Sequence, residues 1–171
     1  YVCEVSTGCR DEDAARSVLS KLERRAELVK SEVLSKSEAA MADHQTTSIA
    51  VHFGAYLNHL RAKGITAAHI IDLQHKTDRL FKDCCVESLR DIVAEPLENW
   101  LTEQKGKRMS ARTRNRYLQA VRGFCKWCVE TERLSVNPLA SVPKADENSD
   151  RRRQRRAMTE AELLNLLQVA R

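Results

Sequence analysis

The chain has 171 residues, 42% of them hydrophobic, which is enough for one domain with a buried core. Only 5 glycines and 3 prolines, with few β-branched runs, favour a mostly helical protein. No stretch approaches 18 apolar residues and no signal peptide is visible, so we expect neither a membrane protein nor a secreted one, and a cytoplasmic location. The net charge is +5, but residues 105–133 alone hold nine basic and two acidic side chains, which indicates a nucleic-acid or other anionic partner.

The first 45 residues read as a strand followed by helices. Side chains alternate over residues 1–5, and a turn at Thr7-Gly8 ends that strand. Asp11 or Asp13 then caps a helix with apolar positions through Val29. A second short helix is predicted over residues 35–41, followed by a polar link at 43–48. Because the chain starts at a tyrosine and stops within a helical pattern, we expect a fragment of a longer protein.

Four further helices are predicted between residues 48 and 132. The first spans about 48–63 and ends at Gly64, and the second spans about 66–84. A packed turn around Leu89 and Ile92 precedes the third, which has Pro96 in its first turn. The fourth covers 110–132. Short links between them predict a compact all-α four-helix bundle.

The fourth of these helices separates apolar from cationic side chains. Its buried stripe is predicted to consist of Tyr117, Leu118, Val121, Phe124, Cys125 and Cys128. The opposite face carries Arg112, Arg116, Gln119, Arg122 and Lys126, with Gly123 as a gap where a backbone can approach closely. No acidic residue occurs between Lys105 and Val129, whereas a merely solvated helix normally mixes both charges. We therefore interpret this face as a surface for DNA rather than a solvated one.

A basic linker and one more helix complete the sequence. Five of the six positions 151–156 are arginine, in a segment that is either a solvated linker or a strap across DNA. Thr159 and Glu162 then form a capping box before a leucine-rich helix. That helix has nothing but the bundle to pack against, so we interpret it as the first helix of a further domain.

Three motifs, taken in order, resemble one family. They are FGAYLNHLRAKG in the first bundle helix, SARTRNRYLQAVRGFCKWCVETERLSVNP in the fourth, and RRRQRRAMTEAELLNLL at the end. Their order over residues 46–171 resembles the core-binding domain of the tyrosine recombinases, or phage integrases, and the entry to their catalytic domain. The front end is similar to the tail of the arm-type DNA-binding module of integrases. The resemblance implies an arm-type remnant at 1–45, a SAM-like core-binding domain at 46–143, a basic linker at 144–157 and the start of a catalytic domain at 158–171.

The resemblance also implies a clamp around duplex DNA, with self-association of the full-length parent. The expected contacts are Arg112, Arg114, Arg116, Gln119, Arg122 and Lys126 on the fourth helix, Lys76 and Arg79 on the second, and Arg152 and Arg155 in the linker. The family's catalytic arginine, lysine, His-x-x-Arg and tyrosine lie after that linker. We therefore expect DNA binding for integration or recombination, but no enzymatic activity from this chain.

Other interpretations of the sequence are less favoured. The cysteines Cys84, Cys85, Cys125 and Cys128 have the number for zinc, but two lie on the apolar helix face, which favours buried thiols. The five histidines show no ligand spacing, and Tyr117 lies on the buried stripe and is no candidate nucleophile, so no metal, cofactor or catalytic residue is predicted. The alternative function is a helical module that docks an acidic protein with its basic face.

Overall fold

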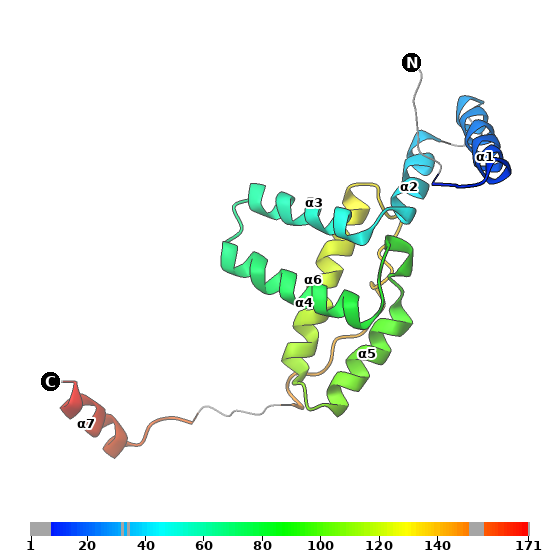
Figure 1. Ribbon diagram of the computed structural model, residues 1–171. Coiled ribbons are helices and arrows are strands. Elements are labelled where there is room, and N and C mark those ends of the chain that lie inside the picture. Colours follow the sequence, from blue (N-terminus) through cyan, green and yellow to red (C-terminus); the bar gives the residue numbers. More distant parts are fainter. Residues whose placement is uncertain (1–7, 32, 34, 151–155, 171) are drawn as a thin grey trace.

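The structure, a computed structural model, describes residues 8–31, 33, 35–150 and 156–170. Within these ranges the chain forms helices and no strand, so the predicted all-α class is confirmed (Figure 1). The elements are α1 (Glu12–Lys30), α2 (Lys36–Thr46), α3 (Ile49–Ala62), α4 (Ala67–Asp83), the 3-10 helix η1 (Leu89–Asp91), α5 (Ala94–Gly106), α6 (Ala111–Glu130) and α7 (Glu160–Val169). The strand predicted over residues 1–5 lies outside the described residues.

Local signals in the sequence explain where the helices begin and end. Asp11 is the cap of α1, since its side chain accepts a hydrogen bond from the Ala14 amide at 3.1 Å. Gly64 ends α3 with a φ of +76°, a conformation that glycine adopts without strain. Helices α3, α4, α5 and α6 therefore lie close to the predicted positions.

The second helix is longer than the sequence pattern predicts. The predicted link at 43–48 is helical as far as Thr46, so that part of the prediction was wrong. A capping box of Ser35 and Glu38 starts α2, and contacts with neighbours then hold its polar C-terminal half. The His44 carbonyl, for example, lies 2.9 Å from Nε2 of His52 in α3.

Helices α3, α4, α5 and α6 share one hydrophobic core. Phe124 of α6 is fully buried at its centre. The ring centroids of Phe53 and Phe81 lie 5.6 and 6.0 Å from it in edge-to-face geometry. From α5, Trp100 packs into the same core and is 5% exposed. In Figure 1, α3 and α4 cross α6 side by side, while α5 runs along its other end.

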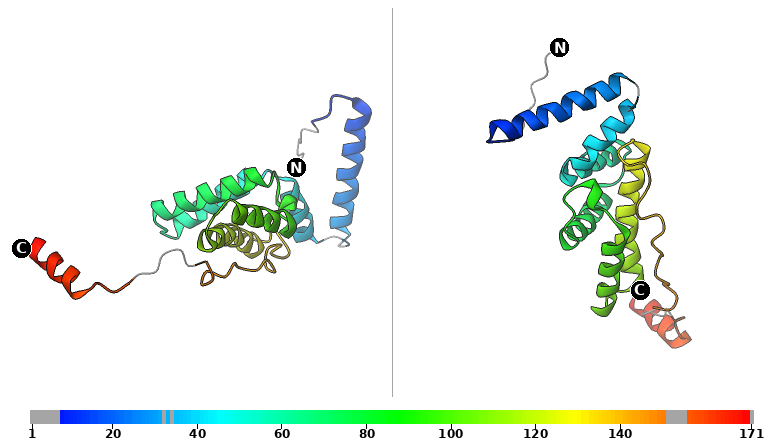
Figure 2. Two further views of the ribbon diagram at one scale, coloured as in Figure 1. Left: turned by 90° about the horizontal axis from the view of Figure 1, so that it is seen from below. Right: turned by 90° about the vertical axis from the view of Figure 1, so that its right-hand side faces the viewer.

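Helices α1 and α2 form a separate pair at one end of the molecule. No residue of α1 is buried, and α1 contacts α2 (Figure 2). Arg25 joins them by donating to Asp43 at 2.5 Å and to the Ala39 carbonyl. This pair reaches the core through contacts between α2 and η1.

After α6 the chain turns back and runs along that helix. We call residues 134–150 the return segment. Leu139 and Val142 are buried against the core, and Asn115 of α6 binds the backbone of Ala145 in both directions, at 2.8 and 2.9 Å. A carboxylate oxygen of Asp150 accepts a hydrogen bond from the Ala111 amide at 2.6 Å, at the start of α6. The first part of the predicted basic linker is therefore attached to the bundle.

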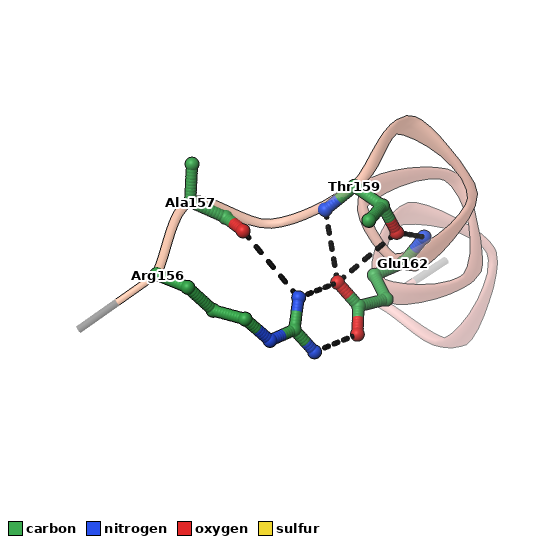
Figure 3. A network of polar contacts seen from close by, with 4 residues as sticks. All are labelled: Arg156, Ala157, Thr159 and Glu162. Atoms are coloured by element: carbon green, nitrogen blue, oxygen red, sulfur yellow. Dashed lines mark hydrogen bonds and ion pairs between the residues drawn. The ribbon is translucent and has the colours of Figure 1, made fainter. Parts of the chain in front are cut away.

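The predicted capping box of α7 is present. Thr159 and Glu162 exchange side-chain and backbone hydrogen bonds, and Arg156 donates to both carboxylate oxygens of Glu162 (Figure 3). These bonds lower the pKa of Glu162 to about 2. No residue of α7 is buried, and its leucines Leu163, Leu164, Leu166 and Leu167 are all about half exposed.

Candidate nucleic-acid interface

Helix α6 presents three different faces to its surroundings. The apolar face enters the core, where Leu118, Val121 and Phe124 are at most 1% exposed. A second face lies under the return segment. The third face is open and borders α4, and it carries most of the exposed polar side chains of the helix.

The open face holds a stripe of exposed side chains, Arg112, Arg116, Gln119 and Lys126. They are four, three and seven residues apart, which at about 100° per residue places them within an arc of about 80°. Arg112 and Arg116 form no ion pair with any residue that the structure describes. Lys126 lies 3.7 Å from Glu130, but its side chain is 75% exposed, so this pair is weak.

A groove of about 450 Å³ runs between this stripe and α4. Arg116 and Gln119 line one side, and His69, Asp72 and Lys76 line the other. Lys76 donates to Asp72, which lowers the pKa of that carboxyl group. Lys76 therefore lies at the predicted interface, but an acidic side chain offsets its charge.

Arg79 lies in a different environment from its neighbour Lys76. Its guanidinium group is 5.9 Å from the ring centroid of Trp100 and 5.8 Å from that of Tyr117. It also donates to the Tyr117 hydroxyl and to Gln104, both at 3.3 Å. These contacts join α4, α5 and α6. Arg79 therefore has partners within the molecule, while its side chain stays 49% exposed, and its contact with DNA stays a prediction.

Arg122 also has partners within the molecule. Its Nε donates to the Leu139 carbonyl at 2.8 Å, and one terminal nitrogen donates to the carbonyls of Ala140, at 2.8 Å, and Val142. These bonds attach the return segment to α6 and use Nε and one terminal nitrogen of Arg122. Arg122 does not belong to the open face.

The remaining predicted contacts are Arg114 and the two linker arginines. Arg114 is partly buried and lines a second cavity, of about 300 Å³, with Asn115 and Lys144. Its Nε has no hydrogen-bond partner among the described residues. Arg152 and Arg155 lie outside the described residues, so their predicted contacts remain predictions.

One groove residue was not predicted from the sequence. Tyr56 of α3 falls on the apolar stripe of its helix, and its ring is buried as that pattern indicates. Its hydroxyl nevertheless lies beside Gly123, 3.2 Å from where a Cβ at that position would be, and Tyr56 lines the groove. The only sequence feature that could have pointed to this contact was Gly123, the glycine among the cationic residues of α6.

Two of the cysteines belong to the core. Cys125 and Cys128 are fully buried, as predicted, and burial raises the pKa of each thiol to about 12. Cys85, by contrast, is exposed at the end of α4. In the part of the chain that the structure describes, no group of three or more His, Cys, Asp or Glu side chains is arranged to hold a metal ion.

Neither the described helices nor known proteins point to a membrane span or to a family. Among the helices of the described ranges, none combines the length and the apolar character needed to cross a membrane. No family model, curated protein or solved structure matches the chain. The assignment of a function therefore depends on the residues and the geometry given above.

Proposed function

We propose that this chain binds duplex DNA through the open face of α6 and the groove beside it, as the DNA-gripping part of a site-specific recombinase of the tyrosine recombinase family. The observation that carries this proposal is the stripe of Arg112, Arg116 and Gln119, which is exposed and free of acidic neighbours on its own helix. The family assignment, including the SAM-like form of the bundle and the clamp, is supported by the sequence motifs in α3, α6 and residues 151–167.

The side chains of the stripe divide into two roles. Arg112 and Arg116 supply sequence-independent affinity by contacting phosphates, and each contact releases condensed counterions from the duplex. Gln119 lines the groove together with Arg116, and its amide matches the donor and acceptor pair of an adenine edge in the DNA major groove. The major groove of B-DNA is about 12 Å wide and accommodates an α-helix.

The proposal is tested by measuring the affinity of the full chain for duplex DNA over a series of salt concentrations. Replacing both Arg112 and Arg116 with Ala should lower the affinity at least tenfold. The slope of log affinity against log salt should fall by about two, one unit for each lost phosphate contact. The matched control replaces Lys82 of α4 and Arg90 of η1 with Ala, two exposed cations outside the stripe, and should bind as the wild type does.

Two results would reject the proposal. One is a wild-type chain that does not bind duplex DNA at low salt, which favours the alternative of a protein-docking module. The other is an Arg112→Ala, Arg116→Ala variant whose affinity and salt slope equal those of the control.

A further inference from the structure

Gly123 occupies a position where a glycine is unfavourable. It lies in the interior of α6, where glycine is the least favourable residue after proline. A Cβ added at this position would have one atom of another element within 4 Å, the Tyr56 hydroxyl oxygen at 3.2 Å. The glycine is therefore not required by a close approach of two helix backbones; it leaves room beside the Tyr56 hydroxyl, which a Cβ would press against.

The Tyr56 side chain is held rigidly beneath this gap. Its ring is 6% exposed, and its centroid lies 5.6 Å from that of Phe124 and 5.4 Å from that of Trp127. Burial raises the pKa of the phenol, so the hydroxyl keeps its proton and remains a donor. No residue in the described ranges forms a hydrogen bond with this hydroxyl. A buried ring thus presents an unpaired polar atom at the floor of the groove.

We propose that Tyr56 is a further DNA contact, whose hydroxyl donates a hydrogen bond through the gap at Gly123 to a phosphate oxygen of the bound duplex. This inference rests on the proposed function and names an atom in the same groove. Arg116, which lines the same groove and has no ion pair among the described residues, favours an anionic acceptor, whereas Asp72 offsets the charge of Lys76. A hydrogen bond to an ionised oxygen is short and about twice as strong as one between neutral groups.

A neutral donor has a signature that distinguishes it from an arginine. A lost arginine–phosphate contact lowers both the affinity and its salt dependence, because counterion release is lost. A lost hydroxyl contact lowers the affinity alone. The loss should also be equal for duplexes of different sequence, because a phosphate contact carries no sequence information.

Three variants test the inference against the wild-type chain: Tyr56→Phe, Gly123→Ala and the double variant. Tyr56→Phe should weaken binding to two unrelated duplexes by about tenfold with an unchanged salt slope. Gly123→Ala should weaken binding similarly while its thermal unfolding temperature stays the same or rises, because alanine favours the helix. The double variant should bind no more weakly than either single variant, since both remove one contact.

The outcomes separate the two proposals. If the wild type binds DNA and both single variants bind equally well, the Tyr56 contact is rejected and the proposed function stands. A reduced unfolding temperature for Gly123→Ala that the double variant restores, with DNA binding unchanged in Tyr56→Phe, shows that the glycine only makes room for the hydroxyl, which also rejects the inference. If the wild type does not bind, both proposals fail.

Discussion

Arg116 and Arg122 lie on the same helix, six residues apart, and both were expected to contact DNA. Arg116 is exposed beside the groove, whereas Arg122 donates to the carbonyls of Leu139, Ala140 and Val142. The return segment makes the difference, because it covers one flank of α6 and leaves the other open (Figure 1). The cationic residues of one helix can therefore include both exposed side chains and side chains bonded within the molecule.

The largest effect on stability is expected from Arg122→Ala. This change leaves three carbonyl oxygens of the return segment without their donor, and should lower the free energy of unfolding by about 2–3 kcal/mol, as for hydrogen bonds to a charged group. Urea unfolding measures the loss, and the folded variant should bind DNA nearly as the wild type does. A variant of normal stability with a lower salt slope of DNA binding would instead make Arg122 a phosphate contact.

A smaller loss of stability is expected from Asn115→Ala. The Asn115 side chain makes three hydrogen bonds, two to the backbone of Ala145 and one to Glu147 at 2.8 Å. Without them the free energy of unfolding should fall by about 1–2 kcal/mol, and proteases should cut residues 143–150 faster. Gln119→Ala is the matched control on the open face. It should change DNA binding but leave the free energy of unfolding and the rate of proteolysis unchanged. Equal stability losses in both variants would remove the distinction between the two flanks.

The distinction between the faces could be predicted only in part from the sequence. Periodicity located α3 to α6 and the buried stripe of α6, because apolar burial determines both. It did not separate Arg116 from Arg122, since Arg122 binds backbone carbonyls, which any sequence supplies. The contacts of Arg79 with Trp100 and Tyr117 were not predicted, because a sequence pattern does not show that a long side chain folds over neighbouring rings. The Tyr56 hydroxyl was missed because an apolar pattern does not reveal the polar tip of a buried tyrosine.

A third prediction concerns the pH dependence of stability and the buried histidine His52. His52 is 1% exposed, its Nε2 faces the His44 carbonyl, and its Nδ1 lies 2.7 Å from Arg133, so only a neutral ring satisfies both partners. Burial lowers the pKa of His52 below its usual 6.5. The unfolded chain then binds the proton more readily, so stability should be full above pH 6.5 and decline as the pH falls through the folded-state pKa.

Unfolding in urea at pH 8, 6.5 and 5.5 checks this expectation. The decline should be smaller in His52→Gln and unchanged in His75→Gln, since His75 is exposed on α4. A wild-type chain that is equally stable at all three pH values contradicts the neutral, buried role of His52.

The smallest effect is expected from Asp72→Asn on the open side. Asp72 pairs with Lys76 in the groove, so removing its charge frees a cation for phosphate. Affinity for duplex DNA should rise by about two- to fivefold at low salt, with a slightly steeper salt dependence. Asp78→Asn, elsewhere on α4, serves as the control for a general change in net charge. An equal gain of affinity in that control would show that the effect comes from net charge and not from the groove.

An NMR titration of the isotope-labelled chain with a short duplex tests the central claim most directly, because it reports on every face of α6 at once. We predict that the largest shift changes occur at Arg112, Arg116, Gln119 and Gly123, and that the amides of residues 139–147 change little. Changes concentrated in the return segment, or none at saturating DNA, would contradict the proposal that the open face of α6 binds the duplex.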